Sequence, residues 1–259
     1  GITFSMRYRS ELAANDQFQK NVSAARSQLD YMDTMLDQVG QVLSRARELA
    51  VKGADGANPQ TALDAIAIEV EELYDQLVDI GNSKYNGKYI FNGQLTDAKP
   101  YPSANASGVS SDDRYIEYEI GAGLHITVNV TGNEVFGSEN DADNAFRILE
   151  DMIANLRAGN VEAIGGNDDK GIPGVIALID QRMDKVLDAR SAVGARTNRL
   201  ELVEGRLTDI GIYLQSLQSK TEDADQAEVI VNLKIAENVY QAALSTGAKL
   251  IRPSLIDFI

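Results

Sequence analysis

The amino-acid sequence predicts a mainly α protein, a long antiparallel helical bundle or coiled coil that carries a small outer β domain. In several stretches the apolar residues recur at steps of four and three, the spacing of helices that pack along one face. One central stretch has a two-residue period instead, which is typical of strands. The 259 residues include five prolines, no tryptophan and 6% aromatic residues, a composition that suits long helices better than a sandwich or barrel.

The N-terminal stretch predicts one long helix. Its apolar stripe runs through Phe18, Val22, Ala25, Leu29, Met32, Leu36, Val39, Leu43, Ala46 and Ala50. At 1.5 Å per residue this stripe would extend about 50 Å. Gly53 stands where a left-handed C-cap would end the helix.

A second helix is expected to run back along the first. Asn58 and Pro59 are typical of an N-cap followed by proline at the first helical position. The apolar stripe of this helix comprises Leu63, Ile66, Val70, Leu73, Leu77 and Ile80. The pairs Asn86-Gly87 and Asn92-Gly93 then predict tight turns around a short strand or hairpin.

Residues 96–137 are predicted to form the small outer β domain. The alternating apolar residues on the two sides of a Gly121–Gly123 turn are Ile116, Tyr118, Ile120, Leu124, Ile126, Val128 and Val130. The single histidine, His125, falls between apolar positions of its strand. We therefore expect His125 on the solvent-facing side of the hairpin, as a surface residue.

The C-terminal half returns to helical spacing. A helix is predicted from Phe146 to Leu156, with Asp141 and Asp143 as cap candidates and Gly159 at its end. In the longer helix that follows, every seventh residue is aliphatic: Ile179, Val186, Val193, Leu200, Leu207 and Leu214.

The last helical segment is apolar around most of its circumference. Such a helix is stable only when it is buried in something larger, because too little of its surface suits water. We expect it to be an assembly interface with other copies or partners. The expected interface residues are Val229, Leu233, Ala236, Tyr240, Ala243, Leu250, Leu255 and Phe258.

Charge and composition exclude several functional classes. The chain has 24 basic and 39 acidic residues and a net charge of −15, which repels nucleic-acid phosphates and anionic membrane surfaces. No apolar stretch reaches the roughly 18 residues of a membrane span, and the opening residues lack the pattern of a secretory signal. The absence of cysteine excludes thiol catalysis and thiolate metal sites.

We find no catalytic constellation and expect no catalytic residue, metal site or cofactor. His125 has neither a second histidine nor a nucleophile–base pair with it. The acidic clusters at Asp112-Asp113, Asp141/Asp143 and Asp168-Asp169 do not have the spacing of a calcium loop, and we expect caps and solvated turns there. A metal-assisted hydrolase that uses Asp112, Asp141 and Asp168 is the remaining enzymatic alternative.

Four stretches of the sequence together resemble one protein family. The first contains MRYRSEL, QFQKN and SRARELAV between Met6 and Val51, and the other three are GKYIFNGQLTD at 87–97, GNEVFG at 132–137 and PSLIDFI at 253–259. In this combination the chain resembles the hook-associated protein 3 family, the hook–filament junction proteins of the flagellin superfamily. The stretch GKYIFNGQLTD is more similar to the junction proteins than to flagellin.

The resemblance implies a structural role and a domain plan. Residues 1–95 and 138–220 would form the two halves of a helical core domain, residues 96–137 the outer β domain, and residues 221–259 an inner assembly helix, expected to be disordered or prone to aggregation in isolation. The protein would be no enzyme; it would join hook to filament outside the cell through a ring of its own copies. The implied partners are hook-associated protein 1, flagellin and a cytoplasmic export chaperone, and export would need no cleaved signal.

Three points stay open from the sequence. Family members usually have a helix and a Ser-Asp-Asp-Pro turn ahead of the region that matches Met6, so either an engineered core fragment or a shortened natural protein is expected, and we favour the first. A filament subunit of the flagellin type is the nearest functional alternative. An extracellular binding module or adhesin, with the Tyr115 and Tyr118 region as its surface, is the alternative from another class.

Overall fold

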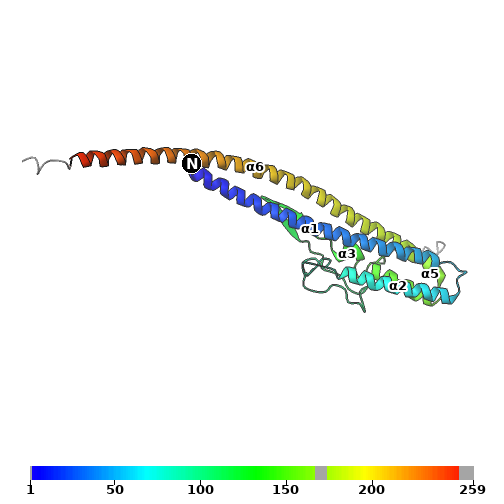
Figure 1. Cartoon of the computed structure of the whole chain (residues 1–259). Helices are drawn as coiled ribbons and strands as arrows, with labels where there is room; N and C mark the ends of the chain where they lie inside the picture. Colours follow the sequence, from blue (N-terminus) through cyan, green and yellow to red (C-terminus); the bar gives the residue numbers. More distant parts are fainter. Residues whose placement is uncertain (1, 167–173, 251–259) are drawn as a thin grey trace, which may run out of the picture. The chain divides into compact units, whose positions relative to one another are not determined.

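The computed structural model describes residues 2–166 and 174–250, and the predicted mainly α class is confirmed (Figure 1). The helices are α1 (Ile2–Gly53), α2 (Gln60–Gly81), α3 (Gly132–Phe136), α4 (Ala145–Arg157), α5 (Val161–Gly165) and α6 (Val175–Leu250). Two antiparallel hairpins pair β1 (Lys84–Tyr85) with β2 (Lys88–Tyr89) and β3 (Glu117–Gly121) with β4 (Leu124–Thr127). The chain divides into two compact units: Phe18–Gly205, called the body here, and a terminal unit made of the two ends of the chain.

The body is organised around the predicted stripe of α1. Every stripe residue from Val22 to Ala50 is fully buried, whereas Phe18 at its start is half-buried. The heptad residues of α6 that belong to the body, Ile179, Val186, Val193 and Leu200, are buried as well, with Ile179 and Leu200 at 0% exposure. The two helices are held in register by side-chain ion pairs that join Arg26 to Glu201 and Glu204, Arg47 to Asp180, and Arg190 to Asp33 and Asp37.

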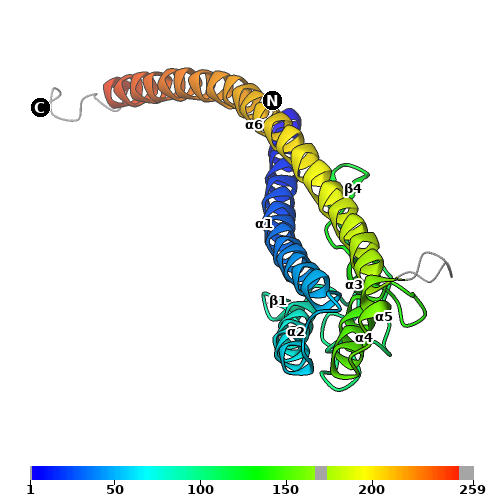
Figure 2. The ribbon, with the colours of Figure 1, turned by 90° about the vertical axis from the view of Figure 1, so that its right-hand side faces the viewer.

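Helix α2 forms as predicted, but its cap residues do not act as expected. Pro59 is the N-cap residue, one position ahead of the helix, and Asn58 instead donates its side-chain amide to the carbonyl of Lys52, 2.6 Å away. Gly53 is not a left-handed C-cap; it is the last residue of α1. A Cβ at Gly53 would lie 2.6 Å from Leu156, so close packing of α4 explains the glycine. Figure 2 shows α2 and α4 side by side.

The predicted β domain contains one two-stranded hairpin. Tyr118 faces Ile126 and Glu119 faces His125, and the His125 side chain is exposed as predicted. The segment GNEVFG contains the short helix α3, which the strand pattern did not indicate. Thr131 and Glu134 form a capping box at its start: each side chain accepts a hydrogen bond from the backbone N–H of the other residue.

The predicted caps of α4 need a similar correction. Asn144 is the N-cap, and its side-chain oxygen accepts from the backbone N–H groups of Phe146 and Arg147. Asp141 accepts from the N–H of Ser138 in the preceding turn, and Asp143 forms ion pairs with α6. Gly159 ends the helix with a positive φ of 67°, as predicted.

Two glycines of GNEVFG allow the loop to approach its neighbours closely. A Cβ at Gly132 would lie 2.1 Å from the hydroxyl of the buried Tyr101, and one at Gly137 would lie 2.6 Å from the guanidinium of Arg182. The rings of Phe91, Tyr101, Phe136 and Phe146 form a cluster around this contact, with centroids 4.8–5.3 Å apart.

We expect Gly132→Ala to lower the free energy of unfolding by about 1–3 kcal/mol, since the added methyl group must displace a buried tyrosine. Gly40→Ala is the matched control, because Gly40 lies within α1 and no atom would stand within 4 Å of its Cβ. That change should raise the free energy by about 0.5–1 kcal/mol through helix propensity. Urea unfolding of both variants measures the difference, and equal effects would contradict the packing account.

Candidate assembly surface

Most of the predicted interface residues lie in residues 228–247 of α6, called the terminal apolar segment here. Five of the eight predicted residues lie in it with described side chains, and all five are exposed, from Leu233 at 55% to Tyr240 at 66% among the large ones. The side chain of Leu250 and residues Leu255 and Phe258 lie outside the described part of the chain.

The exposure in this segment extends beyond the predicted residues. Eight large apolar side chains are each more than half exposed: Val229, Ile230, Val231, Leu233, Ile235, Val239, Tyr240 and Leu244. Because they include neighbouring positions such as 229–231, they surround the helix rather than follow one stripe. Full burial of such a side chain contributes roughly 1.5–3 kcal/mol. Burial of these side chains against a partner would therefore contribute a large favourable free energy.

Several polar side chains of the segment lie on one strip of the helix, at Lys234, Glu237, Asn238 and Gln241. Lys234 and Glu237 form an i,i+3 ion pair of 2.8 Å there. Ser245 and Thr246 donate their hydroxyls to the carbonyl of Ala242. These bonds engage four polar side chains of the segment within the helix itself.

The terminal unit exposes further apolar residues that the sequence pattern did not single out. Phe4 and Met6 near the start of α1 are 58% and 69% exposed, and Ile212 and Tyr213 of α6 are 62% and 64% exposed. Phe4 and Met6 precede the regular stripe, so periodicity gave no signal for them. Within this unit the side chain of Asn15 donates to the carbonyl of Leu207, 3.0 Å away.

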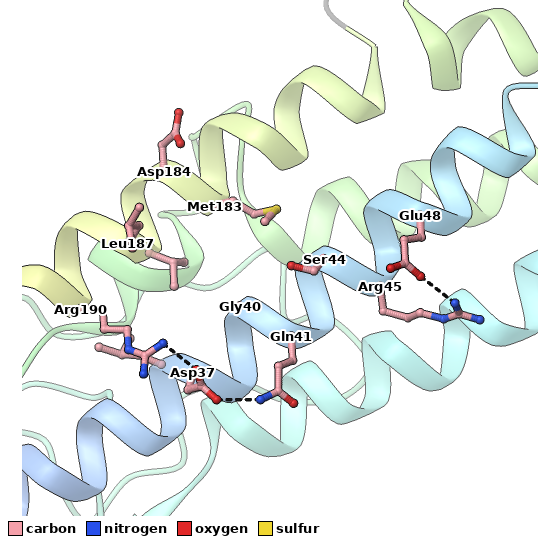
Figure 3. A pocket seen from close by; sticks show the side chains of 12 residues that line it. Asp37, Gly40, Gln41, Ser44, Arg45, Glu48, Met183, Asp184, Leu187 and Arg190 are labelled. Atoms are coloured by element: carbon pink, nitrogen blue, oxygen red, sulfur yellow. Dashed lines mark hydrogen bonds and ion pairs between the residues drawn. The ribbon is translucent and has the colours of Figure 1, made fainter.

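The body has a groove between α1 and α6 (Figure 3). Its volume is about 500 Å³, and Gly40 and Ser44 of α1 leave room opposite Met183 and the 61%-exposed Leu187 of α6. Four of the charged groups at its edges are paired within the chain, Arg190 with Asp37 and Arg45 with Glu48, and Asp184 is a further charged residue of the lining. This groove suits a packed contact with an apolar side chain better than a charged ligand.

The strongest electrostatic feature of the body is Arg182, a cation with 1% exposure. Its Nε donates to the carbonyl of Asp143 at 2.7 Å, and its Nη2 lies 2.9 Å from the carboxylate of Asp143. Burial lowers the pKa of Arg182, while the carboxylates of Asp143 and Asp141 act to raise it. Lys185 pairs with the other oxygen of Asp143 at 2.8 Å. This cluster fastens the loop before α4 to α6.

The acidic clusters have local explanations in the described part of the chain. Asp112 pairs with Arg114 and accepts from the N–H of Gln94, and these contacts hold its pKa below the usual value. Asp113 accepts from the side chain of Asn133. Asp168 and Asp169 lie outside the described residues. Among the described residues, no group of three or more His, Cys, Asp or Glu side chains could hold a metal ion.

The fold and the exposed terminal helix define a flagellin-type axial protein. The N-terminal helical region of bacterial flagellin matches residues 1–96, and the C-terminal helical region matches residues 176–259. Together these regions span well over half of the chain, and the chain belongs to the flagellin superfamily. None of the helices in the described residues is long and apolar enough to cross a membrane.

Similar proteins include junction and filament components of flagella. Flagellar hook-associated protein 3 of Salmonella typhimurium is 22% identical over 90% of this chain and 78% of its own length. The flagellar filament 30.7 kDa core protein of Treponema maltophilum is 24% identical over 96% and 80%. The crystal structure of flagellar hook associated protein-3 of Legionella pneumophila covers 86% of this chain and 100% of its own, with 18% identity and a TM-score of 0.71.

We expect Arg182→Met to lower the free energy of unfolding by about 3 kcal/mol, because the buried carboxylate of Asp143 would lose the one of its two cationic partners that is itself buried. Arg190→Met is the matched control at an exposed ion pair and should cost no more than about 1 kcal/mol. Chemical denaturation of the two variants tests this order. A smaller loss for Arg182→Met than for Arg190→Met would show that the buried cluster does not stabilise the fold.

Proposed function

We propose that this protein is a structural adaptor of the bacterial flagellum that joins the hook to the filament. One observation carries the proposal: the terminal apolar segment presents eight large, exposed apolar side chains on a helix of a flagellin-type protein. The similarity to hook-associated protein 3 supports the junction rather than another place in the flagellum. So does GKYIFNG, which covers β2 and the turns that follow it.

In this proposal the adaptor works through protein–protein contacts alone and catalyses no reaction. Copies arranged head to tail make heterologous contacts, so a ring can present one face to the hook and a different face to the filament. In this proposal residues 221–259 form the inner assembly segment, with Leu250, Leu255 and Phe258 extending the interface. Residues 1–95 and 138–220 form the surrounding core domain, and residues 96–137 face outward.

The axial partners are further copies of the chain, hook-associated protein 1 and flagellin. Before export, the terminal apolar segment needs protection from water and from other copies, and a cytoplasmic export chaperone would supply it. Export proceeds without a cleaved signal, and the protein functions outside the cell at the hook–filament junction.

Deletion of the gene tests the proposal against the filament alternative, to which the similarity with a filament core protein also points. Electron microscopy of the deleted cells is combined with an immunoblot for flagellin in the medium. Hooks without filaments, with flagellin released to the medium, support the junction role. Loss of flagellin from both cells and medium would identify the chain as a filament subunit, and normal flagella would contradict both functions.

Complementation with Leu233→Asp tests the terminal apolar segment itself. Leu233 is 55% exposed, so the variant should change the free energy of unfolding by no more than about 0.5 kcal/mol. It should nevertheless abolish filament attachment, because it places a carboxylate in the proposed interface. Motility and filament counts measure attachment, and thermal unfolding measures stability.

Asn238→Asp is the matched control, since it adds the same charge to the exposed polar strip of the same segment. It should leave filament attachment intact. A large fall in melting temperature for Leu233→Asp would show instead that Leu233 belongs to the core of the folded chain. Equal loss of attachment in both variants would contradict a specific apolar interface.

A further inference from the structure

A second pocket in the body lies between the two hairpins and α1. Its volume is about 380 Å³, within the roughly 300–1,000 Å³ of small-ligand pockets. The turn of β1 and β2 forms one side, β3 forms the other, and Gln28 of α1 lies at its edge. The proposed assembly function does not use this pocket.

Three half-buried tyrosines line the pocket: Tyr85, Tyr89 and Tyr118. Each ring has a contact with another side chain of the body. Tyr85 packs on Tyr31 with ring centroids 5.3 Å apart, and the Nζ of Lys84 lies 4.4 Å from the centre of the Tyr89 ring. The Tyr118 hydroxyl donates to the side-chain oxygen of Gln28 at 3.3 Å. These contacts favour the present positions of the three rings, which give the pocket aromatic walls.

The pocket is also lined by polar side chains that are available to a ligand. Within the residues that the structure describes, the side chains of Asn86, Lys88 and Thr96 form no hydrogen bond or ion pair, and the amide nitrogen of Gln28 donates to no group. These residues offer hydrogen-bond donors and acceptors together. Lys88 is the charged residue among the described lining residues.

The backbone fixes this polar edge. Asn86 and Gly87 both have positive φ, 50° and 79°, as a two-residue hairpin turn of type I′ requires. The turn pairs Tyr85 with Lys88 and Lys84 with Tyr89. Because the turn is short and its backbone conformation is set, Asn86 and Lys88 are held beside Tyr85 and Tyr89 in the hairpin.

We propose that this pocket binds the pyranose ring of a saccharide, with preference for a ring that carries a carboxylate. A pyranose ring has an apolar C–H face that packs on an aromatic ring and hydroxyls that both donate and accept hydrogen bonds. The tyrosines match the first property, and Gln28, Asn86 and Thr96 match the second. Lys88 supplies a cation for the carboxylate.

Saturation-transfer NMR on the intact chain tests the proposal with two probes, methyl β-D-glucuronide and methyl β-D-glucoside. Both should bind saturably, the glucuronide more tightly. Tyr89→Ala removes one wall and should weaken both by about fivefold or more. Lys88→Gln should make the two affinities equal. Tyr213→Ala, at an exposed tyrosine of the terminal unit, should change neither.

Circular dichroism melting checks that each variant folds. If Tyr89→Ala does not fold, Gln28→Ala takes its place, since it removes an amide at the edge of the pocket and the acceptor of the Tyr118 hydroxyl, and the affinity for both sugars should again fall. The proposal is overturned if neither sugar binds saturably, or if binding survives the pocket variants as it survives Tyr213→Ala. A preference for glucuronide that persists in Lys88→Gln would overturn the role of the lysine.

Discussion

The buried stripe of α1 is the contact on which the rest of the body depends. Nine consecutive stripe positions from Val22 to Ala50 are fully buried, so this face of α1 is covered along its whole length in the body. The heptad residues of α6 from Ile179 to Leu200 are buried as well, and the arginine ion pairs that join the two helices are exposed. Such pairs contribute little free energy, and we infer that their main effect is to favour one register between the two helices.

The need to bury apolar side chains also explains why the end of α6 differs from the helices of the body. A single stripe can be satisfied by one neighbouring helix, as in the body. The terminal apolar segment has large apolar side chains around its circumference, and one neighbour cannot cover them all. We therefore infer that this surface is covered by a partner, as the proposed assembly function requires.

Periodicity was sufficient to predict the four longer helices, the hairpin of β3 and β4, the buried stripe and the breadth of the terminal apolar segment, but it did not indicate the short helices α3 and α5. It failed where a residue's role depends on a distant neighbour. Gly53 is explained by Leu156, and Gly132 by Tyr101. The buried Arg182 gave no signal, because its partner Asp143 is 39 residues away. Local capping was also misassigned: Asn144 rather than Asp143 caps α4. Which side chain caps a helix depends on tertiary contacts, since Asp143 is paired with Arg182 and Lys185 of α6 instead.

Hydrogen–deuterium exchange of residues 228–247 is the most direct measurement of the central claim. The isolated chain is compared with the same chain assembled in purified hook–filament structures. If the segment is buried only by assembly, its amides should exchange rapidly in the isolated chain, since a helix without packing partners opens easily, and should be strongly protected in the assembled state. Equal, strong protection in both states would mean that the segment is already buried within the isolated protein and would contradict the account.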